Sequence, residues 1–367
     1  MRVLHVAGAR PNFMKVAPVM RALADRSIDQ ALVHTGQHYD PMMSAAFFDD
    51  LGLPEPDVHL EVGSGSHAAQ TARIMERIEP VLLDQKPDLT VVVGDVNSTI
   101  AVALVCAKML LPVAHVEAGL RSFDRTMPEE INRLLTDQLS DLLFTTSPEA
   151  EANLTAEGCR GEIHFVGNPM IDSLERHLTH ARASDVLERI GLEQRGYALV
   201  TLHRPSNVDD PETLRGILEA LRDAAVELPV LFPIHPRTVK MLDTFGLSEM
   251  VMMGGAPARG IVTCIDPVGY VDFLRLMADA RVVVTDSGGI QEETTILGVP
   301  CLTVRHNTER PITCELGTNT LIGTDPERIR TETLAAARAE PLRDAQRPPL
   351  WDGKAGERIA DVIVARA

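Results

Sequence analysis

Short apolar runs alternate with longer amphipathic segments along the first half of the chain. The apolar runs are rich in Val, Leu and Ile, and they cover residues 3–7, 31–34, 89–94, 113–117, 142–146 and 163–166. Between them lie segments with apolar residues at helical spacing, such as residues 16–25 and 69–83. Continuous apolar runs separated by helices are typical of a buried parallel sheet. The pattern therefore predicts an α/β domain made of β-α-β units.

The same alternation begins again in the second half of the chain. The predicted strands there cover residues 198–201, 230–233, 261–265, 282–285 and 301–304. Helical spacing is found at residues 211–227 and 289–297.

This restart predicts two doubly wound, Rossmann-like domains with parallel sheets. We expect an N-terminal domain at residues 1–168 and a C-terminal domain at residues 169–352, with a final helix at residues 353–367 that packs back on the first domain. Sheets of this type bind ligands beyond the carboxyl ends of their strands, so we expect the site in a cleft between the domains.

Composition narrows the classes of partner. The formal net charge of -17 disfavours a broad electrostatic surface for nucleic acid or anionic lipid, so we expect neither as a partner. The most apolar stretch, residues 101–116, is interrupted by Lys108 and Pro112 and is too short for a membrane span. The chain shows no signal-peptide pattern, and its five cysteines lack metal-ligand spacing. We expect a cytoplasmic protein without a metal.

The turn after the first predicted strand carries two cations. Gly8 permits a tight turn, and Arg10 and Lys15 stand near the start of the next helix. Helix amides and cations together suit a diphosphate. The alternative is a solvated turn with two surface cations.

Two carboxylates follow neighbouring predicted strands. Asp95 comes after residues 89–94, and Glu117 ends the next strand. If these strands are parallel neighbours, both side chains emerge at one sheet edge, where they could exchange protons with a sugar carbon. The alternative is that Asp95 caps a helix and Glu117 is a loop charge. We favour catalysis, because a partly buried carboxylate without a partner costs free energy.

A further acidic group follows soon after Glu117. Pro128 marks a helix start, and Glu129 and Arg133 share a face at i, i+4 spacing. A surface ion pair is the more common explanation of this spacing, and only the position of the segment favours a catalytic role for Glu129.

Two histidines follow strands in the second half. His203 and His235 each come directly after an apolar run. Their equivalent positions favour a shared site over two separate structural roles. Neither has the companion ligands that zinc requires.

Residues 283–293 form the strongest local signal, a strand followed by a Ser-Gly-Gly turn and an acidic helix start. The amides of Ser287, Gly288 and Gly289 could bind a phosphate, and a glutamate one turn later could accept both hydroxyls of a ribose. A capped helix would explain the glutamates but not the adjacent glycines. After the next strand, Arg310 offers another cation.

Taken in order, these segments resemble the non-hydrolysing UDP-N-acetylglucosamine 2-epimerases. The resemblance covers essentially the whole chain, and its motifs are GARPNFMKVAP at residues 8–18, HVEAGLR at 115–121, DSGGIQEE at 286–293 and DGKA at 352–355. That family has the two-domain GT-B fold.

The resemblance implies removal of the C2 proton, expulsion of UDP to leave a 2-acetamidoglucal, and re-addition of UDP with protonation on the opposite face. UDP-N-acetylglucosamine and UDP are the implied ligands, no cofactor is needed, and a homodimer acting in cell-envelope polysaccharide biosynthesis is expected. The implied acid/base residues are Asp95, Glu117 and Glu129, assisted by His203. The implied substrate-binding residues are Arg10, Lys15, Arg133, His235, Ser287, Gly288, Gly289, Glu293 and Arg310.

Some positions depart from the pattern of the family. Asn12, the run at residues 97–99 and Met127 replace residues that relatives often carry. Gln37 and His38 match a pair that binds an activating second substrate molecule in many bacterial members. The departures leave room for an epimerase of a modified UDP sugar, such as a diacetamido uronate. A GT-B glycosyltransferase and a non-catalytic nucleotide-sugar binding protein are also compatible with these residues.

Overall fold

The computed structural model describes residues 1–37, 48, 51–339 and 346–366. The chain divides into two compact units, the first formed by Met1–Ser173 with Pro349–Ala367 and the second by Leu174–Pro348.

The first unit contains a parallel sheet of seven strands in the order β3-β2-β1-β4-β5-β6-β7. The strands are β1 (Arg2–Ala7), β2 (Asp29–His34), β3 (Val58–His59), β4 (Leu89–Val93), β5 (Val113–Ala118), β6 (Leu142–Thr145) and β7 (Glu162–Phe165). The helices are α1 (Arg10–Ala24), α3 (His67–Gln85), α4 (Asn97–Met109), α5 (Pro128–Leu139), α6 (Pro148–Ala156) and α16 (Ala355–Val364), and the chain leaves this unit within α7 (Pro169–Arg182).

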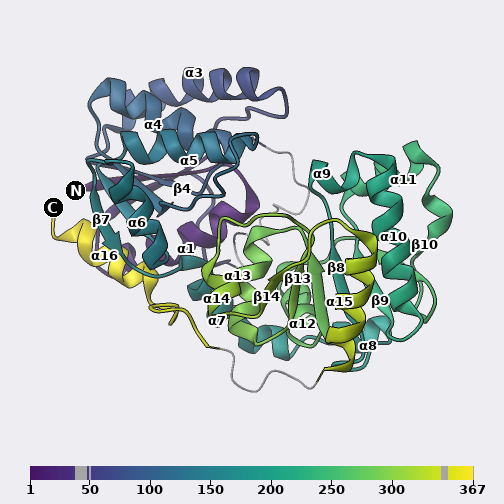
Figure 1. Cartoon of the computed structure of the whole chain (residues 1–367). Helices are drawn as coiled ribbons and strands as arrows, with labels where there is room; N and C mark the ends of the chain where they lie inside the picture. The colour runs from purple at the N-terminus through teal and green to yellow at the C-terminus, as the bar shows by residue number, and fades with distance from the viewer. Residues whose placement is uncertain (38–47, 49–50, 340–345, 367) are drawn as a thin grey trace. The chain divides into compact units, whose positions relative to one another are not determined.

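Helices of the first unit pack in two groups. Helices α3, α4 and α5 lie side by side, whereas the C-terminal helix α16 packs against α1 (Figure 1). The two helices of the second group approach closely, because a Cβ at Gly356 would lie 2.6 Å from the carbonyl oxygen of Pro18. Asp172 fixes the start of α16 by accepting hydrogen bonds from the amides of Ala355 and Gly356 at 3.1 and 2.8 Å.

The second unit contains another parallel sheet of seven strands, in the order β10-β11-β9-β8-β12-β13-β14. The strands are β8 (Ala198–Thr201), β9 (Val230–Pro233), β10 (Val251–Met253), β11 (Val262–Ile265), β12 (Val282–Thr285), β13 (Cys301–Thr303) and β14 (Asn319–Leu321). The helices are α8 (Val186–Ile190), α9 (Pro205–Val208), α10 (Pro211–Ala225), α11 (Pro236–Phe245), the 3₁₀ helix η1 (Ser248–Met250), α12 (Tyr270–Ala278), α13 (Gly288–Leu297), α14 (Ile312–Glu315) and α15 (Pro326–Arg338).

The strand cores explain why the apolar runs predict this fold. All residues of β4 and β5 are buried, as are those of β12 and β13, because helices cover both faces of each sheet. The prediction of two doubly wound α/β units is thereby confirmed. The apolar pattern does not predict the short strands β3, β10 and β14. Among the described helices, none combines the length and the apolar character that crossing a membrane requires.

Candidate functional site

The carboxyl ends of β4 and β5 bring two carboxylates to one sheet edge. The strands are parallel neighbours, with Val93 paired to Val116, which confirms that Asp95, two residues after β4, and Glu117, near the end of β5, lie at the same sheet edge. Asp95 does not cap α4, whose N-cap is Val96. Glu117 is 4% exposed and is therefore a buried carboxylate, not a loop charge.

Each of these carboxylates has a cationic partner. The ammonium group of Lys15 donates to Oε2 of Glu117, and both side chains are buried. The side chain of Asp95 is 29% exposed, and its Oδ2 lies 2.5 Å from Nη1 of Arg133. Both carboxylates therefore lie next to a fixed positive charge.

The turn after β1 differs in part from the expected cation site. Arg10 starts α1 and is partly exposed, but Lys15 is buried and contacts Glu117, so it is not a free surface cation. Gly8 is needed there, since a Cβ would lie 2.2 Å from Oγ of Ser98. Asn12 accepts from the amide of Ala9 at 3.1 Å and donates to the carbonyl of Val93 at 3.1 Å, which ties α1 to the end of β4.

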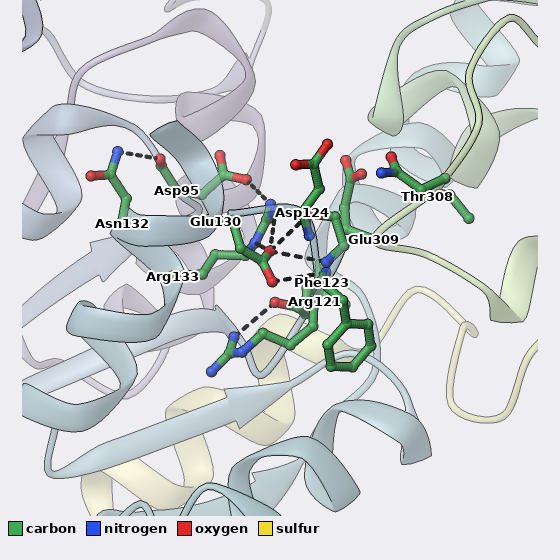
Figure 2. Close-up of polar contacts among 12 residues, drawn as sticks. Asp95, Arg121, Phe123, Asp124, Glu130, Asn132, Arg133, Thr308 and Glu309 are labelled. Carbon is green, nitrogen blue, oxygen red and sulfur yellow. Dashed lines mark hydrogen bonds and ion pairs between the residues drawn. The ribbon is translucent and has the colours of Figure 1, made fainter. Parts of the chain in front are cut away.

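The predicted surface pair between Glu129 and Arg133 is wrong. Arg133 is 2% exposed, and it pairs with Glu130 at 2.7 Å and with Asp95 (Figure 2). Both i, i+3 and i, i+4 neighbours share a helix face, and burial selects the i, i+3 partner here. Glu129 is partly exposed and forms no hydrogen bond or ion pair with another described residue.

Glu130 is a buried residue that the sequence did not single out. Its carboxylate accepts hydrogen bonds from the amides of Ser122 and Phe123, both at 2.9 Å (Figure 2). Burial opposes ionisation of Glu130, but these amides and Arg133 outweigh it, so its pKa lies below the usual value. Glu130 therefore holds the loop after β5 and the buried guanidinium together.

A polar network surrounds the start of α4. Oε1 of Gln37 accepts from the amide and hydroxyl of Ser98 at 2.9 and 2.7 Å, and the carbonyl of Gln37 accepts from Gln70. Asn97 donates to Oε1 of Gln70 at 2.8 Å. The residues at 97 and 98 that depart from the family pattern thus lie within this network. His38 lies outside the described residues.

In the second unit, the ends of β8 and β9 bring the two predicted histidines together. The strands are parallel neighbours, and the rings of His203 and His235 are 5.8 Å apart. His235 is the N-cap of α11, where its Nδ1 accepts from the amide of Arg237 at 3.1 Å. His203 remains 44% exposed, and its Nδ1 lies 3.0 Å from Oδ1 of Asp286.

Asp286 organises the loop after β8. It is fully buried and accepts hydrogen bonds from the amides of His203 and Arg204 and from the side chain of Asn207. Burial opposes its ionisation, but His203 and these amides outweigh burial, so the pKa of Asp286 lies below the usual value. The sequence contains Asp286 within the motif but gives no sign of its partners, since they lie about 80 residues away.

Helix α13 begins at Gly288, so the two glycines of the expected Ser-Gly-Gly turn lie within the helix and not before it. Ser287 is the N-cap, but its amide donates to Oγ1 of Thr285 at 3.0 Å, so the amides left for a ligand begin at Gly288. Gly288 and Gly289 occupy the first helical turn, where amides have no partner within the helix. Glu293 is 4% exposed and accepts from the hydroxyl of Tyr270 at 2.8 Å.

Arg310 belongs to a buried ionic cluster. Its Nε lies 2.7 Å from Oε1 of Glu292, and its Nη1 lies 2.5 Å from Oε1 of Glu309. Glu309 also pairs with Arg305 at 2.7 Å. Burial opposes ionisation of Glu309, but Arg310 and Arg305 hold its pKa well below the usual value. A Cβ at Gly288 would collide with both Arg310 and Glu309, so the glycine lets the helix start lie against this cluster.

No three His, Cys, Asp or Glu side chains within the described part of the chain come together in a way that could hold a metal ion. The polar groups at the strand ends of both units are instead carboxylates with cationic partners, histidines and helix amides.

This fold is that of a two-unit α/β protein with Rossmann-like sheets. The family model described as UDP-N-acetylglucosamine 2-epimerase matches residues 21–364. The chain belongs to this family, which confirms the resemblance of the sequence motifs.

Individual relatives match over nearly the full length. The UDP-N-acetylglucosamine 2-epimerase of Methanocaldococcus jannaschii is 41% identical over 99% of both chains. The UDP-2,3-diacetamido-2,3-dideoxy-D-glucuronate 2-epimerase of Pseudomonas aeruginosa is 40% identical, also over 99% of both chains. Among solved structures, the M. jannaschii epimerase in complex with UDP-GlcNAc and UDP has a TM-score of 0.91, with 41% identity and 100% of both chains covered.

Proposed function

We propose that this protein interconverts UDP-N-acetylglucosamine and UDP-N-acetylmannosamine by elimination and re-addition of UDP. A base takes the proton from C2, the electron pair of that bond forms the C1–C2 double bond, and the C1–O bond breaks with its electrons on UDP. The 2-acetamidoglucal then accepts UDP at C1 and a proton at C2 on the other face. The overall reaction is an isomerisation with no net oxidation or reduction.

In this proposal the first unit supplies the proton-transfer groups. Asp95 and Glu117 lie at adjacent strand ends and are the first candidates for base and acid. Glu129, one helix turn before Arg133, is the third acid/base candidate. Inverting C2 requires proton removal from one face and delivery to the other, which two separately held carboxylates can perform.

In this proposal, cations of the first unit neutralise the two carboxylates and bind the phosphates of the leaving group. Lys15 and Arg133 neutralise Glu117 and Asp95 before substrate binds. Negative phosphate oxygens would compete for these cations and free the carboxylates to accept a proton. Arg10, at the start of α1, is the remaining candidate for a phosphate partner in this unit.

The second unit supplies the nucleotide contacts. The amides of Gly288 and Gly289, with the hydroxyl of Ser287, would bind phosphate at the start of α13. Glu293 would accept the ribose hydroxyls, in place of or beside Tyr270.

The histidines and Arg310 complete the proposed contacts of this unit. His203, held at Nδ1 by Asp286, keeps Nε2 for the substrate and assists the transfer, and His235 beside it would donate to the diphosphate. Arg310 would act within its ionic cluster, as a positive charge behind the glycine turn.

The observation that carries the proposal is the pair of carboxylates at neighbouring strand ends in a chain that matches 2-epimerases over its full length. Incubation with UDP-N-acetylglucosamine in deuterium oxide should place deuterium at C2 and form the manno epimer. A glycosyltransferase without an acceptor, or a binding protein, would do neither. For the variant Asp95→Asn, the matched control is Asp88→Asn, because Asp88 precedes β4 and therefore lies at the opposite end of this strand from Asp95.

A second substrate is favoured by one specific finding. The P. aeruginosa relative, which is named for a diacetamido uronate, is 40% identical to this chain, almost as similar as the M. jannaschii enzyme. Comparing kcat/KM for the two UDP sugars decides between them. A value at least about tenfold higher for the uronate, about 1.4 kcal/mol of transition-state free energy, would assign the modified sugar as the substrate.

A further inference from the structure

Glu117 has a backbone conformation that glutamate rarely adopts. Its φ is +73°, in the left-handed region, and the pairing of β5 with β6 shifts register between Val116 and Ala118. Such a conformation costs free energy and persists only when the surrounding structure enforces it. The direction of the Glu117 side chain, toward Lys15, depends on this bulge.

One buried carboxylate holds the chain on both sides of Glu117. Asp137 on α5 is fully buried, and its Oδ1 lies 2.6 Å from Nδ1 of His115, two residues before Glu117. Its Oδ2 accepts from the amide of Gly119, two residues after Glu117, at 3.1 Å and pairs with Arg121 at 2.7 Å. Asp137 thus fixes both flanks of the bulge.

His115 also connects Asp137 to the turn that carries the second carboxylate, Asp95. Nε2 of His115 lies 2.8 Å from the carbonyl oxygen of Gly94, the residue before Asp95. The imidazole is fully buried and links Asp137 to the turn after β4. Rigid links of this kind matter because proton transfer depends on sub-ångström placement of the acid and the base.

The charge of Asp137 is maintained in this buried position. Burial opposes its ionisation, but His115 and Arg121 outweigh burial, so the pKa of Asp137 lies below the usual value. Arg121 is itself held by Glu157 at 2.6 Å. The carboxylate therefore has two acceptor oxygens committed to three partners, each on the segment that contains Glu117.

We propose that Asp137 is a positioning residue for both proton-transfer carboxylates, Asp95 and Glu117, acting through His115 and the amide of Gly119. The inference rests on the proposed epimerase function, because it assigns Asp137 a role in the geometry of that reaction. Asp137 itself does not touch the substrate.

The test is Asp137→Asn, which keeps the size of the side chain and removes its charge. Misplacement of the acid and base should lower kcat by about 10²-fold, while KM and the Kd for UDP change by less than about threefold. Asp172→Asn is the matched control, since Asp172 is a buried aspartate of the same unit that accepts two amides at the start of α16. The control should retain wild-type kcat. Asp137→Glu keeps the charge, but its kcat should also stay below the wild-type value, because the longer side chain cannot keep all three contacts.

If Asp137→Asn does not fold, His115→Gln tests the same link, because it removes the contact with Asp137 and should lower kcat in the same way. Equal kcat for Asp137→Asn and Asp172→Asn would overturn the inference while leaving the proposed function intact. Absence of C2 exchange in the wild-type protein would instead overturn the proposed function. A crystal structure of Asp137→Asn decides the structural point independently of activity: a positive φ and an intact Lys15 contact at Glu117 would overturn the inference.

Discussion

Replacing Glu130 by Gln should destabilise the first unit, whereas replacing the adjacent Glu129 by Gln should leave its stability almost unchanged. Glu130 is 2% exposed and accepts from two amides, from a hydroxyl and from Arg133. Glu129 is partly exposed and has no such partner among the described residues. The two substitutions are chemically identical and one residue apart, so each is the control for the other.

The expected magnitude follows from these contacts. Glutamine keeps one acceptor oxygen, but it turns an NH₂ group toward donors and leaves Arg133 with less compensating charge. Neutralising one partner of a buried ion pair costs about 3–5 kcal/mol. Because Arg133 retains Asp95, we expect the lower end, about 3 kcal/mol, for Glu130→Gln. For Glu129→Gln we expect less than about 0.5 kcal/mol.

The chain offers a built-in probe for this measurement. Trp351 is the single tryptophan of the sequence, and it is buried in the first unit, where its Nε1 donates to the carbonyl of Thr146 at 2.8 Å. Urea unfolding followed by tryptophan fluorescence therefore reports on the first unit. Equal midpoints for the Glu129→Gln and Glu130→Gln variants would refute the reasoning.

The pH dependence adds a second check. The folded-state pKa of Glu130 is lowered, so its contribution to stability is present above the unfolded value of about 4.3 and is lost as pH falls through the folded value. The difference in the free energy of unfolding between wild type and Glu130→Gln should therefore be constant near neutral pH and shrink below about pH 4. A difference that grows on acidification would contradict the assigned ion pair.

Three further substitutions test other parts of the structure. Gly288→Ala places a Cβ 2.5 Å from Nη1 of Arg310, and calorimetry should show UDP affinity reduced by about tenfold or more, whereas unchanged affinity would argue against phosphate binding at this turn. Asp286→Ala removes the acceptor of several buried donors and should destabilise the second unit by about 3 kcal/mol in urea unfolding followed by circular dichroism. Gly119→Ala combines a φ of +80° with a Cβ 2.4 Å from the carbonyl of Ala150, and should destabilise the first unit by about 2 kcal/mol or more in the fluorescence assay.

The fold was predictable because its strands are buried on both faces. Runs such as residues 89–94 and 282–285 are mostly valine and leucine and contain no charged residue, which separates them from amphipathic helices. The short strands β3, β10 and β14 were not predictable in the same way. Each has two or three residues, too few for a periodic pattern.

Part of the candidate site was predictable from strand ends. Asp95 and Glu117 follow adjacent parallel strands, so their proximity needs only the topology. Their partners could not be predicted. Spacing alone cannot choose between Glu129 and Glu130 as the partner of Arg133, since both lie on its helix face, and the choice depends on which side packs against the sheet.

Contacts between residues far apart in the sequence explain why the partners of other site residues could not be predicted. Asp137 meets His115 from 22 residues away, and Asp286 meets His203 from 83 residues away. An isolated aspartate in a helix or after a strand carries no local sign of such a partner. The role of Lys15 at a phosphate site stays a prediction, but its position near a helix start gives no sign of the contact with Glu117, 102 residues later.

The most direct test of proton transfer by the carboxylates at the ends of β4 and β5 is proton NMR of UDP-N-acetylglucosamine in deuterium oxide, with wild-type protein and with Asp95→Asn. We expect the wild-type protein to place deuterium at C2 of both epimers, and the variant to do so slower by about 10²-fold or more. Epimer formation without deuterium at C2, or equal rates for the two proteins, would contradict this mechanism.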